Sequence, residues 1–123
     1  MILQASTSRK PYTVITKLGM KRKDYFLRVR PQSSLSFDVT VNANTENNEK
    51  AFWKFSGLAK RNALESSVVL VGISIPDVTA EPIYENTYVE VEEEHTNGSI
   101  KFSVVGLETV SIKWTITIKA KET

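Results

Sequence analysis

His95, the one histidine of the chain, is the first residue to consider for acid–base chemistry. It follows Glu93 and Glu94 and precedes the turn signal Asn97-Gly98. A catalytic base needs a nucleophile or an acid held opposite it by a defined fold, and usually a partner that orients the ring. Glutamates in a solvated turn do not supply such a frame. The sequence therefore predicts an inert, exposed histidine.

The acidic stretch 76–86 raises the question of a metal site. Asp77, Glu81 and Glu85 are spaced by four, but two prolines in the stretch prevent that spacing from marking one helix face. The ligand order of an EF-hand around a central glycine is missing. The sequence also contains neither a glycine-rich phosphate loop nor a nucleophile motif. We therefore predict no catalytic residue, no metal site and no cofactor, and a protein that is not an enzyme.

The segment from Lys17 to Arg30 combines basic residues with two adjacent aromatic residues, Tyr25 and Phe26. Grooves that bind single-stranded nucleic acid need this combination, because cations neutralise phosphates and aromatic rings stack on bases. Alternation along the segment, however, directs Tyr25 inward with Leu27 and Val29. A hairpin with a solvated basic tip accounts for the same residues. A single-stranded nucleic-acid-binding β-barrel is therefore the second alternative function, and nucleic acid the less favoured partner.

Aromatic and amide side chains offer another binding chemistry. Carbohydrate-binding sandwiches stack sugar rings on exposed aromatic faces and hold the hydroxyls with amides and carboxylates. Trp53 lies in an apolar strand, which favours a place in the core. A lectin-like β-sandwich with a glycan partner is the first alternative function. The candidate side chains are Asn44, Asn47, Asn48, Trp53, Tyr84 and Tyr88.

Charge is unevenly distributed along the chain, although the net charge is only +2. Residues 1–30 contain eight basic residues and one acidic residue, whereas residues 76–98 contain seven acidic residues and no Lys or Arg. Such asymmetry indicates a charged partner, although neutralisation within the fold and head-to-tail contact between copies explain it equally. We predict that contacts involve the basic residues Lys21, Arg22, Lys23, Arg28 and Arg30 and the acidic residues Glu90, Glu92 and Glu94.

Composition excludes further classes of protein. The 123 residues include no cysteine, which removes disulfides, thiol catalysis and thiolate metal sites. The first residues lack the apolar run of a signal peptide, and no run approaches the length of a membrane span. We expect synthesis in the cytosol without a signal peptide and no membrane insertion, with incorporation into a virion or other particle left open. The length predicts a single domain over 1–123, with 1–10 as an N-terminal arm.

Hydrophobic alternation marks the clearest elements. Residues 110–120 alternate without a break, and 100–104 repeat the pattern upstream. A period of two places every apolar side chain on one side of a strand. We expect the turn at 105–108 to fold these two runs into a hairpin. A second hairpin is expected from strands at 12–18 and 25–30, joined by the basic loop 19–24.

The middle of the chain supplies the remaining elements. Strands are expected at 35–43, at the aromatic segment 51–55 and at 88–94, and one or two helical turns at 57–64. The β-branched run 68–75 favours a central strand, with Gly72 marking a bulge or a close backbone approach. Asn97-Gly98 predicts a two-residue hairpin loop. Its register pairs Val91 with Val104 and Glu94 with Lys101, and leaves open whether a bulge or the sandwich edge accommodates Glu93.

Eight or nine short strands with little helix predict an all-β fold. The expected architecture is a two-sheet antiparallel β-sandwich, jelly-roll-like or immunoglobulin-like, with Trp114, Ile116 and Phe37 in its core. A small sandwich without catalytic chemistry is typical of an assembly subunit. The leading hypothesis is a non-enzymatic structural, assembly or attachment module with a protein partner in a larger assembly and a tendency to form homo-oligomers. Virion and phage components, such as capsid decoration, tail or baseplate pieces, are commonly of this kind.

Overall fold

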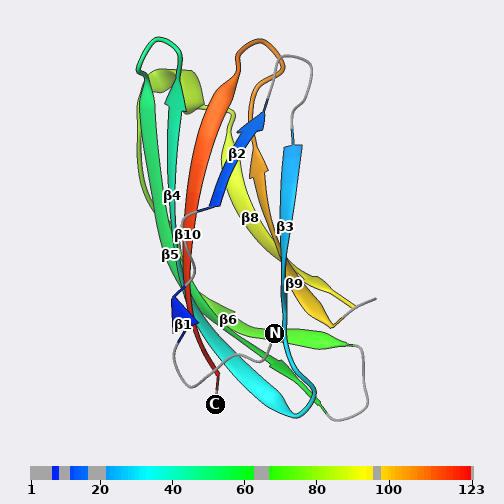
Figure 1. Cartoon of the computed structure of the whole chain (residues 1–123). Helices are drawn as coiled ribbons and strands as arrows, with labels where there is room; N and C mark the ends of the chain where they lie inside the picture. The colour runs from blue at the N-terminus through cyan, green and yellow to red at the C-terminus, as the bar shows by residue number, and fades with distance from the viewer. Residues whose placement is uncertain (1–6, 9–11, 17–21, 63–66, 96–97, 123) are drawn as a thin grey trace.

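Two β-sheets pack face to face and form a sandwich, as Figure 1 shows. A computed structural model describes residues 7–8, 12–16, 22–62, 67–95 and 98–122. The predicted all-β sandwich is confirmed, with ten strands in the described residues. They are β1 (Thr7–Ser8), β2 (Tyr12–Thr16), β3 (Arg22–Arg28), β4 (Ser33–Thr45), β5 (Lys50–Arg61), β6 (Val68–Ile73), β7 (Asp77–Ala80), β8 (Tyr88–Glu94), β9 (Ser99–Val105) and β10 (Ile112–Glu122), with a 3-10 turn η1 (Pro82–Tyr84) before β8.

The two sheets differ in size. The large sheet has seven strands in the order β1-β10-β4-β5-β6, with β2 also paired to β10 and β7 also paired to β5. Its centre is therefore the long trio β10, β4 and β5, and two short strands share each flank. The small sheet has three strands in the order β3-β9-β8. All described pairs are antiparallel.

Alternate residues of the long strands fill the core between the sheets. Trp114 is fully buried, and Phe37 and Ile116 are 2% and 4% exposed, so the predicted core residues are confirmed. The Trp114 ring lies 5.4 Å from that of Trp53, and Phe37 meets Phe102 of the small sheet edge to face at 5.5 Å. Each fully buried side chain of this kind stabilises the fold by roughly 1.5–3 kcal/mol.

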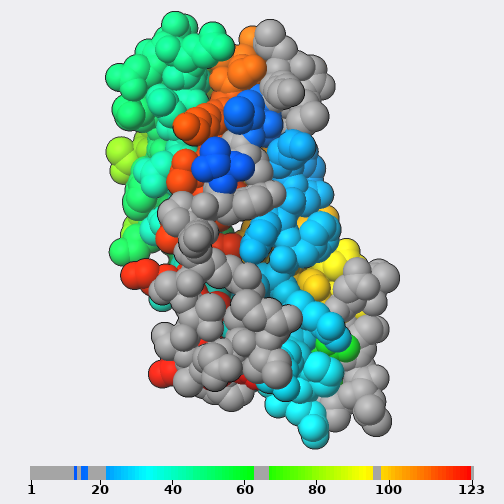
Figure 2. Space-filling view, viewed as in Figure 1, coloured from blue at the N-terminus to red at the C-terminus, as the bar shows by residue number. Residues whose placement is uncertain are grey.

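Two of the three predicted hairpins are wrong, whereas the third, formed by β8 and β9, is present. The runs at 99–105 and 112–122 belong to different sheets, since β9 pairs with β3 and β8 whereas β10 pairs with β4. The strands at 12–16 and 22–28 are divided in the same way, because β2 pairs with β10 and β3 with β9. Figure 2 shows β2 at the surface between β10 and β3. Alternation reports that one face is buried, but facing sheets bury it as well as a shared sheet does.

The helical turns predicted at 57–64 are replaced by strand as far as Arg61, and 63–66 lie outside the described residues. β5 pairs with β4 along this whole length. Gly57 lies against the ring of Phe37, where a Cβ would come within 2.5 Å of Cζ. The pairing and this close approach outweigh the weak helix propensity of the segment.

The central strand predicted at 68–75 is an edge strand. β6 ends the large sheet, and Val69, Val71 and Ile75 are 45%, 53% and 91% exposed. The predicted bulge is confirmed, since Leu58 pairs with Gly72 and the next residue of β5 pairs with Leu70. Val71 is the extra residue. The continuous apolar run at 68–75 thus belongs to an exposed edge strand and not to a strand buried on both faces.

The register between β8 and β9 differs by two residues from the prediction. Val91 lies opposite Phe102, Glu92 opposite Lys101, and Glu94 opposite Ser99. A shift of two preserves the faces, so Val89 and Val91 still point toward the core. The prediction failed because the connection from β8 to β9 is longer than two residues; its residues 96–97 lie outside the described residues.

The described part of the N-terminal arm lies at the edge of the large sheet, beside the C-terminal end of β10. Thr7 and Ser8 of the predicted arm pair with Ala120 and Lys119 at the end of β10. The other residues of the arm, and positions 19–21 of the predicted basic loop, lie outside the described residues. Arg22 to Asp24, which the sequence placed in that loop, begin β3.

Candidate interaction surfaces

His95 is exposed and its ring serves a structural contact. Its Nε2 lies 3.4 Å from Oε1 of Glu93, and its side chain is 56% exposed. The other carboxylate oxygen of Glu93 accepts a hydrogen bond of 2.8 Å from the backbone N–H of Leu70. Glu93 therefore sits at the sandwich edge and ties β8 to β6, which resolves the alternative left by the sequence.

The described residues contain neither a cluster of metal-binding side chains nor a membrane-spanning helix. No three His, Asp or Glu side chains of the described ranges converge in a way that would hold a metal ion. The same ranges contain one 3-10 turn and no helix with the length and apolar character that a membrane crossing requires.

The outer face of the small sheet brings together three of the eight charged residues that the sequence singled out, namely Arg22, Glu90 and Glu92. β3 and β8 flank β9, and Arg22 reaches across from β3 to Glu90 at 2.8 Å. The same guanidinium contacts Asp24 at 2.9 Å and Glu92 at 3.9 Å. Lys101 of β9 lies 3.5 Å from Glu92. Opposite charges far apart in sequence thus neutralise one another within the fold.

Hydrogen bonding favours the charged forms of Asp24 and Arg22. Burial alone would raise the pKa of Asp24, but hydrogen bonds from Ser103 and Arg22 and the attraction of Arg22 and Lys101 hold that pKa below its ordinary value. The hydrogen bond with Asp24 raises the pKa of Arg22 against the effect of burial. Ser103 donates to Asp24 at 2.6 Å, and Arg22 donates to Ser103 at 2.9 Å.

The remaining predicted contact residues are dispersed. Arg30 pairs with Glu122 at the end of β10, at 3.3 Å. Lys21 lies outside the described residues. Lys23 and Arg28 are exposed, and Glu94 is half-buried.

The outer face of the large sheet carries a second charged surface that the sequence reading missed. Six exposed lysines lie on it, and none has an ion pair with another described residue. Acidic side chains on or beside this face include those of Asp38 on β4 and Asp77 on β7, and the Glu81 carboxylate accepts a hydrogen bond from the backbone N–H of Lys50. The signal available in the sequence was the set of polar positions that alternate with apolar ones along β5 and β10, where these lysines lie. We call this set the lysine face: Lys50, Lys54, Lys60, Lys113, Lys119 and Lys121.

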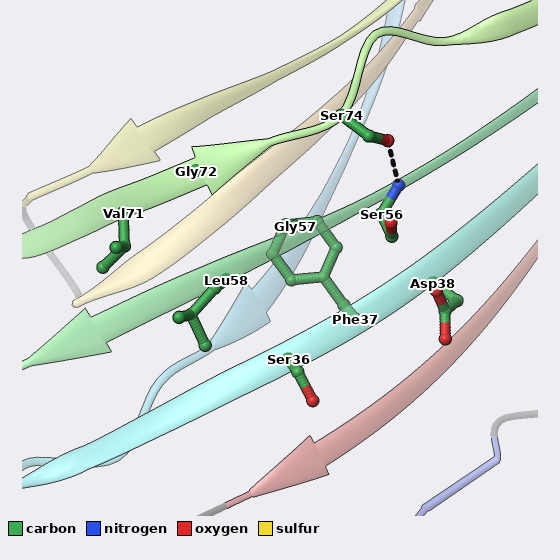
Figure 3. A pocket seen from close by; sticks show the side chains of 9 residues that line it. All are labelled: Ser36, Phe37, Asp38, Ser56, Gly57, Leu58, Val71, Gly72 and Ser74. Carbon is green, nitrogen blue, oxygen red and sulfur yellow. Dashed lines mark hydrogen bonds between the residues drawn. The ribbon is translucent and has the colours of Figure 1, made fainter.

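Two hollows open on or beside the lysine face. The larger, of about 430 Å³, lies where β4, β5 and the β6 bulge meet (Figure 3). In Figure 3, Ser36 and Asp38 come from β4, and a hydrogen bond of 2.8 Å joins the Ser56 N–H to Oγ of Ser74. The smaller, of about 180 Å³, is lined by Asn42, Ala43, Asn44, Lys50, Ala51, Lys113 and Thr115.

An apolar groove follows the open seam between the two sheets. One hollow of about 200 Å³ lies between Phe55 and Val91, and a second of about 440 Å³ lies between Trp53 and Tyr88. Both are lined by Pro76 and Val89, so they form one groove. Exposed apolar side chains border it, namely Ile73, Val78 and Tyr88.

Two aromatic residues of the candidate sugar-binding set are core residues, as the sequence favoured for Trp53. Trp53 and Tyr84 are 4% and 3% exposed and meet edge to face at 6.1 Å. The Tyr84 hydroxyl donates to the backbone carbonyl of Glu49 at 2.7 Å. Burial, together with the nearby carboxylates of Glu49 and Glu81, raises the pKa of Tyr84 to about 12.

Comparison with solved structures shows similarity to a phage protein. No protein-family model matches the sequence, and no curated protein is similar to it. The crystal structure of the tailspike protein gp49 from Acinetobacter baumannii bacteriophage Fri1, a capsular polysaccharide depolymerase, is similar over 99% of this chain, with 12% sequence identity and a TM-score of 0.35. This chain spans 22% of the length of that tailspike chain.

Proposed function

We propose that this chain is a non-enzymatic assembly module that associates with further copies of itself through the edge strand β6. The observation that carries the proposal is the uncovered apolar edge. Natural sandwiches protect such edges with charged side chains, prolines or a covering element. β6 has the sequence VVLVGI, with no charge and no proline. Val69 and Val71 are about half exposed on it.

A second copy of the chain is the occupant that suits this edge. In a two-fold pairing the same strand meets itself, so residue i faces j and j faces i. Antiparallel β6–β6 pairing would place only apolar residues and glycine opposite one another, with no like charges in register. The added backbone ladder would replace the hydrogen bond that the Leu70 N–H now donates to the Glu93 carboxylate.

The proposed setting of this assembly is a virion or phage particle. Its support is an analogy at the level of fold and composition: a small sandwich, cysteine-free and with no cluster of metal-binding side chains in its described residues. The genomic neighbourhood tests it. Genes for particle components on either side are the expected result, and neighbours for metabolic enzymes alone would contradict the proposed setting.

Size-exclusion chromatography with light scattering tests the self-association. The native chain should elute as a dimer or larger species, and Val71→Lys should elute as a monomer because a charged edge resists pairing. Thr109→Lys adds the same charge at an exposed turn and should behave like the native chain. Val69→Lys provides a second edge variant should Val71→Lys lose its circular dichroism spectrum. A monomeric native chain, or edge variants that remain dimeric, would overturn the proposal.

A further inference from the structure

We infer that the lysine face binds a linear acidic polysaccharide along strand β4, independently of the self-association at β6. The outward side chains of β4 form a continuous polar track of amides, hydroxyls and one carboxylate. From Ser34 to Asn44 the track covers ten residue steps, or about 34 Å at ~3.4 Å per residue. It consists of Ser34, Ser36, Asp38, Thr40, Asn42 and Asn44.

Lysines flank this track on both sides for its full length. Lys113 of β10 and Lys50 of β5 both lie opposite Asn44, one on each side. Lower on the track, Lys119 lies opposite Asp38 from the β10 side. The remaining register pairs are Lys54 with Thr40, Lys121 with Ser36 and Lys60 with Ser34. A polymer lying on β4 would therefore meet a cation at most steps.

The positive charge of this track is available to a ligand. None of the six lysines forms an ion pair with another described residue, although Asp38 lies opposite Lys119 and Asp77 opposite Lys54. Uncompensated charges of one sign on a surface attract counter-ions of the other sign and speed their encounter. On the small sheet, by contrast, Arg22 and Lys101 are already paired.

The hollows beside the track supply polar contacts of the kind that sugar hydroxyls use. The smaller hollow lies between Lys50 and Lys113, and its lining includes Asn44. The side-chain oxygen of Asn44 is buried and has no hydrogen-bond partner among the described residues. A buried acceptor without a partner costs stability, so a donor from a bound ligand would satisfy it. The larger hollow offers the hydroxyl of Ser36 and the carboxylate of Asp38.

These side chains favour a polysaccharide over a nucleic acid. Binding of single strands draws much of its affinity from bases stacked on exposed aromatic rings. Phe52, which lies between Lys50 and Lys54 in the sequence, is the aromatic residue of β5 on this face. Its side chain is half-buried. One ring beside a 34 Å track (about ten residues at ~3.4 Å each) does not make a stacking platform. Amides and hydroxyls match sugar hydroxyls, and ammonium groups match uronate carboxylates as point charges.

Fluorescence titration with a labelled polygalacturonate oligosaccharide tests the inference. The native chain should bind at about 50 mM salt and lose at least about tenfold in affinity by about 200 mM salt. Lys50→Gln with Lys113→Gln should weaken binding by at least about tenfold at low salt, since two of the six ionic contacts are removed. Lys23→Gln with Lys101→Gln removes the same charge from the small sheet and should bind like the native chain.

Further probes separate the other outcomes. A neutral dextran of similar length should not bind. A labelled single-stranded oligothymidylate that binds as tightly as the polygalacturonate at equal salt would replace the polysaccharide with nucleic acid as the partner. Equal losses in the two double variants would overturn the assignment to the lysine face, and no binding of either polyanion would overturn the inference itself. Light scattering on the same samples shows whether self-association at β6 is intact, so the two proposals fail separately.

Discussion

The outer faces of the two sheets contain similar numbers of charges but arrange them differently. On the small sheet, basic β3 and acidic β8 are separated by one strand, and Arg22 spans it to Glu90 at 2.8 Å. On the large sheet, the lysines of β5 and β10 flank β4, whose outward residues are almost all neutral. The charges of the small sheet pair with one another, whereas the lysines of the large sheet have no ion pair with another described residue. Sheet order, rather than charge along the chain, creates the difference.

The largest expected loss of stability comes from a substitution in the core, which supports the outer faces of both sheets. Trp114→Ala should lower the free energy of unfolding by about 3–5 kcal/mol, because the ring is fully buried against Trp53 and its Nε1 donates to Thr16 at 3.0 Å. Urea unfolding followed by circular dichroism measures this loss. Thr115→Ala, on the outward side of the same strand, should change stability by no more than about 0.5 kcal/mol. A loss below about 1 kcal/mol for Trp114→Ala would contradict the assigned core.

The paired face should lose more than the open face when one cation is removed. Arg22→Ala strands the carboxylates of Asp24 and Glu90, and we expect it to cost about 1 kcal/mol of unfolding free energy because the side chain is partly solvated. Lys54→Ala, on the lysine face, should change stability by less than about 0.5 kcal/mol. Chemical denaturation of both variants in parallel gives the comparison. Equal costs would mean that the lysines have partners of their own.

Acid should also affect the paired face selectively. The pKa of Asp24 is lowered in the folded state, so its charged form contributes stability that is present above the unfolded pKa of about 3.9 and lost as pH falls through the folded pKa. Asp24→Asn should therefore be less stable than the native chain at pH 7, by under ~1 kcal/mol. The gap should close on acidification below about pH 4. Thermal melts at a series of pH values test this, and a gap that is independent of pH would exclude a charged role for Asp24.

Salt should produce the smallest effect, and it should act on the open face. Repulsion among the six lysines destabilises the fold slightly, so Lys50→Gln with Lys113→Gln should stabilise the chain by a few tenths of a kcal/mol at about 10 mM salt, where screening is weak. The gain should disappear near about 1 M salt. Melting temperatures at the two ionic strengths measure it. A stabilisation that persists at high salt would have to come from something other than charge.

Part of the candidate surface was readable from the sequence. The alternation along 110–120 placed Lys113 and Lys119 opposite the core residue Trp114, and the structure confirms that placement. The inward direction of Leu27 was readable for the same reason, and the exposure of His95 was readable from its place beside a turn signal. The distance between Lys113 and Lys50, however, depends on β4 lying between their strands. No local pattern in the sequence states which strand lies beside which.

The amino-acid sequence by itself determined an all-β chain and, for most strands, which side chains face inward, because a period of two is a local property of each strand. Tertiary structure alone decided that 99–105 and 112–122 face each other across the core, that 68–73 is an edge, and that Arg22 meets Glu90. Those outcomes depend on contacts between residues far apart in the chain, and several strand orders satisfy the same alternation. The open lysine face is one such outcome.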